Sequence, residues 1–205
     1  MMKSILQRTI QVSLLILFLL LMILGKAQLW MGLLAFGILA SFLFGRFYCG
    51  WICSINTALS GVNWIKRKFK VKSLPIPALL LKPWVRAMAF ALFLAAFAMT
   101  MVTGKRLPVL PVLFFLGILL TFLFPEELWH RHLCPYGTLL KGSSFKARKG
   151  MQVDEDLCNN CGACKRVCPA KAVVKTEGKH QILKPDCLVC FQCESSCRQN
   201  AISYQ

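Results

Sequence analysis

Histidine is scarce in this chain: its 205 residues include only three, His130, His132 and His180. None lies inside a long apolar run, so the pair of histidines that a haem b needs between membrane helices is not available. Acidic residues are rare too, since Glu126 and Glu127 are the only ones before residue 150. The sequence also lacks a glycine-rich dinucleotide fingerprint and a phosphate-binding loop. These absences argue against haem and nucleotide cofactors.

Apolar residues dominate instead, at 57% of the chain, with a mean hydropathy of +0.58. A soluble domain of this size is less apolar. Four runs are long enough to cross a bilayer, over residues 9–25, 29–48, 84–103 and 107–124. An uncleaved anchor is the preferred interpretation of the first run. A signal peptide is the alternative, because Gly25-Lys26-Ala27 weakly resembles a cleavage site.

The net charge of +17 is placed unevenly, with nearly all of the basic excess before residue 150. Basic residues that border apolar runs indicate membrane topology rather than nucleic-acid binding. With four spans, most of them lie on the side of both termini and of the 49–83 loop, and only Lys26, Lys105 and Arg106 lie on the other. The positive-inside rule predicts a multi-pass inner-membrane protein whose N- and C-termini are cytoplasmic.

Eight of the 11 cysteines form two C-terminal runs of identical spacing, C-x2-C-x2-C-x3-C. In bacterial ferredoxins with this spacing, three close cysteines bind one cluster and the fourth binds the other. Zinc sites use paired C-x2-C elements with a longer gap, and disulfides do not require this density. The sequence therefore predicts two 4Fe–4S clusters, one held by Cys158, Cys161, Cys164 and Cys197, the other by Cys187, Cys190, Cys193 and Cys168.

Two further residues of this region carry expectations. Arg198 follows Cys197, whereas Pro169 follows Cys168. A nearby cation stabilises an added electron, so the cluster that includes Cys197 is expected to be the easier one to reduce. His180, in the link between the two runs, is interpreted as a solvated turn residue.

The apolar part contains a repeat. Residues 37–44 read GILASFLF and residues 117–124 read GILLTFLF. With one extra residue after the second copy, CGWICSINT at 49–57 aligns with HRHLCPYGT at 130–138. Both copies leave the membrane on the same side, so we interpret them as a parallel repeat of a two-span hairpin.

The repeat aligns Cys49 with His130 and Cys53 with Cys134, at the cytoplasmic ends of the second and fourth spans. Positions i and i+4 share one helical face, so each copy is expected to present two ligands. Together they would form a third iron–sulfur or metal site. The alternative is that these cysteines are buried structural residues and the histidine is interfacial. His132 is a rival ligand outside the repeat register.

The two membrane-edge motifs, followed by two ferredoxin runs, resemble the polyferredoxin-like membrane iron–sulfur proteins. That family includes the quinol-oxidising subunit of periplasmic nitrate reduction and a cytochrome-oxidase maturation ferredoxin. The resemblance covers nearly the whole chain and rests on Cys49-Gly-Trp-Ile-Cys53 and Leu133-Cys134-Pro135-Tyr-Gly137. The chain departs from the family pattern at Ser54, where proline is usual, and at His130, where a cysteine is usual.

Two stretches at the membrane edge leave alternatives open. Residues 59–72 mix apolar and basic side chains, which is typical of a segment in contact with lipid headgroups; docking of an acidic partner is the alternative. Glu126 and Glu127 stand just before the second motif, where a quinol would need a proton acceptor. The preferred interpretation is that both acids end the helix and lie in water.

We therefore expect a membrane α-helical domain over residues 1–140, with four transmembrane helices as two parallel-repeat hairpins. A linker at 141–150 precedes a C-terminal α+β 2x4Fe–4S ferredoxin domain at 151–205. The expected function is that of an electron-transfer subunit of a membrane redox complex, without a catalytic pocket of its own. It would pass electrons between the quinone pool or a membrane partner and a cytoplasmic partner. A maturation or metal-handling reductase and a redox sensor are the alternatives.

Overall fold

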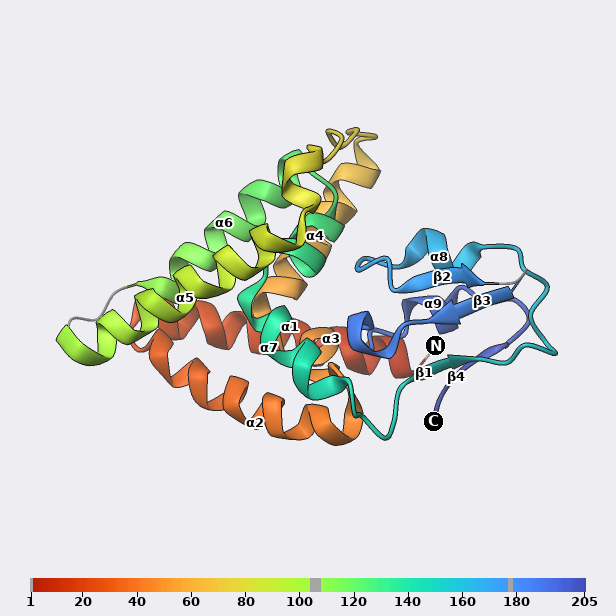
Figure 1. Ribbon diagram of the computed structural model, residues 1–205, viewed down its shortest axis with the longest axis horizontal. Helices are drawn as coiled ribbons and strands as arrows, with labels where there is room; N and C mark the ends of the chain where they lie inside the picture. Colours follow the sequence, from red (N-terminus) through yellow and green to blue (C-terminus); the bar gives the residue numbers. More distant parts are fainter. Residues whose placement is uncertain (1, 104–107, 177–178) are drawn as a thin grey trace. The chain divides into compact units, whose positions relative to one another are not determined.

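A computed structural model describes residues 2–103, 108–176 and 179–205, which are mostly helical (Figure 1). The longer helices are α1 (Met2–Ile23), α2 (Trp30–Phe44), α4 (Ser54–Lys68), α5 (Pro83–Thr103), α6 (Val109–Leu123) and α7 (Pro135–Ser144). The short helical segments are η1 (Ala27–Leu29), α3 (Phe47–Trp51), η2 (Ala78–Leu81), η3 (Leu128–Leu133), α8 (Ala163–Val167), η4 (Lys184–Asp186) and α9 (Gln192–Ser195). The strands are β1 (Met151–Val153), β2 (Val173–Thr176), β3 (Lys179–Ile182) and β4 (Ile202–Tyr204).

The chain forms two compact units. The first comprises Met1–Ile10, Leu34–Ile52 and Leu139–Gln205, and the second comprises Gln11–Leu33 and Cys53–Thr138. The cysteine-rich C-terminal module thus belongs to the same unit as most of α2 and all of α3. Helix α7 continues to Ser144, so the first residues of the predicted 141–150 linker are helical.

Among the described residues, three helices are long and apolar enough to cross a membrane: Ile5–Ile23, Ala27–Phe44 and Pro83–Thr100. Helix α6 is also apolar, but it has only 15 residues. Such a helix is about 22 Å long, against a hydrocarbon core of about 30 Å. The fourth span therefore stays a prediction. Its first residue, Leu107, and the basic pair Lys105 and Arg106 lie outside the described residues.

Helices α2 and α6 bury the same face in both copies of the repeat. Gly37 and Gly117 each pack against the ring of an aromatic residue that comes shortly after the helix in sequence. A Cβ on Gly37 would come within 2.6 Å of the Tyr48 ring, and one on Gly117 within 3.2 Å of Trp129. The other buried positions of this face are Trp30, Leu34 and Ser41 in α2 and Leu110, Phe114 and Thr121 in α6. The duplication thus extends from sequence to packing.

The C-terminal carbonyls of both helices, which have no partner within the helix, are capped in parallel ways. In α2, the Lys149 backbone N–H donates to Leu43 O at 2.9 Å, and the Tyr204 hydroxyl donates to Phe44 O at 3.0 Å. In α6, the Leu74 N–H donates to Leu123 O at 2.9 Å, and the Lys66 ammonium donates to Thr121 O at 2.9 Å and Phe124 O at 3.3 Å. In each copy, a distant segment therefore fixes the helix end from which the motif starts.

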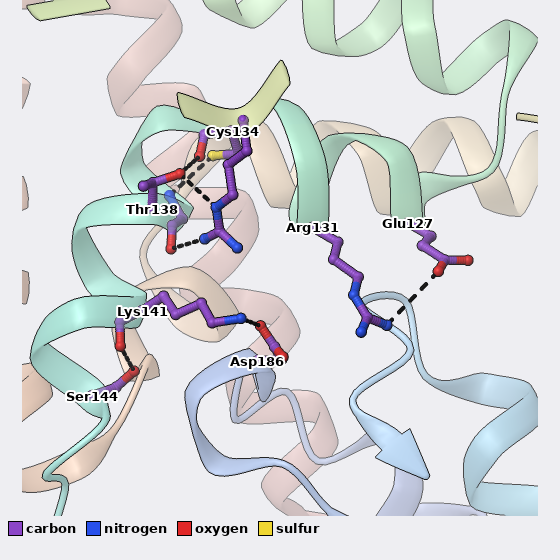
Figure 2. A network of polar contacts seen from close by, with 9 residues as sticks. Glu127, Arg131, Cys134, Thr138, Lys141, Ser144 and Asp186 are labelled. Atoms are coloured by element: carbon purple, nitrogen blue, oxygen red, sulfur yellow. Dashed lines mark hydrogen bonds and ion pairs between the residues drawn. The ribbon is translucent and has the colours of Figure 1, made fainter. Parts of the chain in front are cut away.

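Glu126 lies beside this cap and is only 6% exposed, so the expectation that it lies in water is wrong. Burial raises its pKa, against a hydrogen bond from Asn63 and the charges of Arg67 and Lys66. Its neighbour Glu127 is partly exposed and pairs with Arg131 at 4.0 Å (Figure 2). Sequence reasoning did not separate these acids because the burial of Glu126 depends on α4, far away in the chain.

The C-terminal module contains two small antiparallel sheets (Figure 1). Strand β1 pairs with β4, so that Met151 lies opposite Tyr204 and the two ends of the module are joined. Strands β2 and β3 pair with each other, and Val173 lies opposite Ile182. Met151, Val173, Ile182 and Ile202 form a core with cysteines of both runs. The cysteines are thus fixed to the module's core.

Candidate iron–sulfur sites

The second cysteine run faces a partly open cavity. Cysteines from both runs line this cavity: Cys187, Cys190 and Cys193 from the second run and Cys168 from the first. Most of the remaining lining is apolar, from residues such as Met151, Ala172, Val173, Ile182 and Leu188. The structure therefore brings together the four cysteines that the spacing assigns to one cluster, including the one exchanged between the runs.

The first run faces a separate, partly open cavity. Its cysteines are Cys158, Cys161, Cys164 and Cys197, which is the other predicted set. Cys161 is exposed, whereas each cysteine of the second set is buried or partly buried. The first site is therefore open to water at a cysteine, unlike the second.

His180 lines this first cavity and is only 6% exposed, so its interpretation as a solvated turn residue is wrong. The alternation of β3 explains the error, because His180 and Ile182 face inward and Lys179 and Gln181 face outward. Burial and the nearby charges of Lys165 and Lys175 lower the pKa of His180. A neutral imidazole is favoured beside this set of cysteines.

The loops between the cysteines adopt the same left-handed backbone in both runs. Asn160 and Gly162 have φ of 59° and 71°, and the equivalent Val189 and Phe191 have φ of 53° and 58°. This conformation costs about 1–3 kcal/mol for a residue other than glycine. It turns successive backbone N–H groups toward one side of the loop, as anion-binding loops do. The Val189 N–H accordingly donates to the Cys187 sulfur at 3.4 Å.

Thiol chemistry fits the binding of iron at the second cavity. Burial raises the pKa of Cys187 to about 11 and that of Cys193 to about 12, and neighbouring thiols add to both shifts. Such thiols keep their protons in the absence of iron and release them when they bind it as thiolates. The residues present therefore fit a 4Fe–4S cluster, with four sulfur ligands and backbone donors toward sulfur.

The membrane-edge motifs differ from the predicted i, i+4 helical pairs. Cys49 lies in α3, but Cys53 follows the end of that helix and has an extended backbone, with ψ of 110°, before α4. His130 lies in η3, and Cys134, with ψ of 113°, precedes α7. The shared-face expectation is thus wrong in both copies. Pro135 explains the second break, because a residue before proline avoids the helical conformation.

Segment η3 is a π-helix. The Cys134 N–H donates to Trp129 O at 2.8 Å, a bond across five residues. A π-turn holds one more residue than an α-turn. The extra residue of the second copy lies upstream of this turn, between Phe124 and His130.

All four motif residues are buried, between 5% and 7% exposed. Cys53 and Cys134 occupy equivalent places, because the Thr57 hydroxyl donates to Cys53 O at 3.3 Å and the Thr138 hydroxyl to Cys134 O at 3.2 Å (Figure 2). Burial and the charges of both cysteines raise the pKa of Tyr136, so both thiols lie near this phenol. Cys49 belongs to the first unit, and Cys53, His130 and Cys134 belong to the second.

Across the described residues, no three His, Cys, Asp or Glu side chains converge closely enough to hold one metal ion. This also applies to the eight ferredoxin cysteines, whose arrangement suits a cluster that spreads its ligands over several irons. A mononuclear site at the membrane edge thus has no support among these residues.

Two models of known protein families match the chain. One family model, described as a 4Fe–4S binding domain, matches residues 27–72 and again residues 106–152. A second model with the same description matches residues 151–174. The two matches of the first model fall on the two copies of the repeat, and the second match is one residue longer. The repeat is therefore recognised independently of the register drawn from sequence.

Several curated proteins are similar along most of the chain. An uncharacterised protein of Methanocaldococcus jannaschii is 31% identical over 178 residues, which are 82% of this chain and 67% of that protein. Ferredoxin-type protein NapH of Haemophilus influenzae is 26% identical, over 78% of this chain and 62% of NapH. Methylamine utilization ferredoxin-type protein MauN of Methylorubrum extorquens is 30% identical, over 76% of this chain and 60% of MauN. The chain thus spans about three fifths of NapH and MauN. No solved structure matches.

Proposed function

Since the chain belongs to the polyferredoxin-like membrane iron–sulfur family, as an electron-transport protein of ferredoxin type, we propose that it is an electron-transfer subunit of a membrane redox complex. It passes electrons between the quinone pool or a membrane partner and a cytoplasmic partner. The observation that carries the proposal is the pair of separate cavities, each lined by four cysteines. Bound 4Fe–4S clusters would supply the electron-transfer chemistry.

The proposed ligands form three sets. Cys158, Cys161, Cys164 and Cys197 hold one cluster, and Cys187, Cys190, Cys193 and Cys168 hold the second. Cys49, Cys53, Cys134 and His130 hold a third iron–sulfur centre at the membrane edge. The equivalent positions of Cys53 and Cys134, and the burial of all four residues, support this third set. In the proposal, substrate chemistry belongs to a partner subunit.

Metal analysis and quinol oxidation test this function on the full chain. The protein is purified from membranes without oxygen, its iron and labile sulfide are counted, and the reduced form is examined by electron paramagnetic resonance. We expect at least the ~8 iron atoms of two 4Fe–4S clusters and their reduction in membranes by duroquinol. The proposal fails if the clusters are absent. It also fails if duroquinol leaves them oxidised and no redox subunit copurifies.

We further propose that both termini are cytoplasmic, because the basic residues cluster on that side. Reporter fusions after Lys26 and after Arg106 should read as periplasmic, and fusions near Lys70 and at Gln205 as cytoplasmic. A periplasmic reading at Gln205 would contradict this orientation and the cytoplasmic position of the cysteine-rich module.

A further inference from the structure

A buried arginine stands at the start of the first membrane-edge motif. Arg46 precedes α3 and is only 1% exposed. Its Nη2 donates to the Cys49 sulfur at 3.8 Å, and its Nε has no hydrogen-bond partner among the described residues. None of the ion pairs between described side chains includes it. An isolated buried charge is costly, by several kcal/mol, unless an anion compensates it.

Within the same unit, α3 rests directly on the loop of the second cysteine run. A Cβ on Gly50 would overlap the carbonyl oxygen of Leu188 and lie 2.8 Å from that of Val189. The Trp51 ring meets the Phe191 ring edge-on, with centroids 5.9 Å apart. Helix α3 thus contacts the loop on both sides of Cys190, through backbone before it and through aromatic rings after it.

Arg46 stands at the N-terminal end of this contact, as the residue before α3. A Cβ on its neighbour Gly45 would lie 3.5 Å from the side chain of Val189, in the loop of the second cysteine run. The acid nearest to Cys187 in sequence is Asp186, which is 6% exposed. Its carboxylate is already paired with Lys141 at 2.6 Å (Figure 2). Arg46 therefore lies beside this set of cysteines as a buried cation without a carboxylate partner among the described residues.

We propose that Arg46 is the counter-charge of the iron–sulfur site formed by Cys168, Cys187, Cys190 and Cys193, and that it makes this site the easier of the two to reduce. The proposal rests on the cluster assignment of the proposed function. Four thiolates make a 4Fe–4S cluster anionic, and an added electron makes it more so. A cation held in a low-dielectric interior stabilises that electron more than one in water does.

This proposal reverses the order expected from sequence. Arg198, beside Cys197, was the cation on which that expectation rested, but its side chain is exposed. Water and salt screen an exposed charge. A buried arginine that only the fold brings to the second site therefore outweighs an arginine adjacent in sequence to the first.

Redox titration of the full-length protein, followed by electron paramagnetic resonance, tests the proposal. In Arg46→Met, one cluster should show about a tenfold lower ratio of reduced to oxidised form at a fixed potential, which for one electron is about 59 mV. Arg46→Lys should restore the ratio to within about threefold of the wild type by keeping the charge. Cys190→Ser and Cys161→Ser, each of which alters one signal, assign the shift to its site.

Arg166→Met is the matched control, because Arg166 is an exposed arginine whose Nη1 donates to Cys161 O at 3.4 Å. Neither potential should change in this variant.

Arg46→Gln keeps a donor toward Cys49 but removes the charge, so its potentials give a second measurement of the effect of the charge. Full iron with both potentials unchanged in Arg46→Met and Arg46→Gln would overturn the proposal and leave the electron-transfer function standing. Loss of iron that Arg46→Lys fails to restore would also overturn it. A wild-type protein that lacks the two clusters would instead contradict the proposed function.

Discussion

Replacing Gly50 by alanine is expected to remove iron from the second site while the first site keeps its own. The added Cβ would overlap backbone atoms of Leu188 and Val189, and a backbone cannot rotate out of the way as a side chain can. Overpacking of this kind costs about 1–3 kcal/mol, and more where the backbone must move. Leu188 and Val189 are almost fully buried between Cys187 and Cys190, so a displaced loop moves two of the four proposed ligands.

The measurement is the iron content of the purified full chain together with its thermal midpoint. Gly142→Ala is the matched control, because nothing lies within 4 Å of its added Cβ and α7 should gain slightly from the substitution. Gly37→Ala should fall between the two, since the three atoms nearest its Cβ belong to the side chain of Tyr48 and not to backbone. Wild-type iron and stability in Gly50→Ala would mean that α3 does not rest on this loop.

The C-terminal module shows how far the sequence reaches. Three cysteines within seven residues leave little freedom to the loop that carries them, so the spacing alone predicts that they act together. The ferredoxin pattern adds a fourth cysteine from the other run, and the structure lines each cavity with that set. The repeat can also be predicted from the sequence, because the equivalent residues Gly37 and Gly117 make the same kind of contact with an aromatic ring. In both cases the information is local, or is repeated along the chain.

Burial of charged groups could not be read in the same way. Arg46 and Cys187 are far apart in sequence, and so are Glu126 and Asn63; only the folded chain brings each pair together. The prediction that each membrane-edge motif forms one helical face was wrong for a different reason. A spacing of four fits one helical face, but Cys53 and Cys134 are extended residues between two helices. A periodicity argument holds only while the helix continues.

The second large effect is expected at His130, which occupies the register of Cys49 and is equally buried. If these residues, with Cys53 and Cys134, hold a third iron–sulfur centre, the intact protein should contain more iron than the ~8 atoms of two 4Fe–4S clusters. His130→Ala should bring the count down to about that of two clusters, because a buried cluster that loses one of four protein ligands is no longer held. Iron analysis and low-temperature electron paramagnetic resonance measure both.

His130→Cys should retain the extra iron and lower its potential, since imidazole in place of thiolate raises the potential of iron–sulfur centres. His132→Ala is the matched control: it removes a neighbouring imidazole of the same π-helix that lies outside the repeat register, and both iron and spectrum should stay as in the wild type. If anaerobic preparations hold iron for two clusters only, and His130→Ala changes no signal, the membrane-edge cysteines are structural or redox-active thiols. Electrons from a quinol would then need a cofactor carried by another subunit to reach the C-terminal sites.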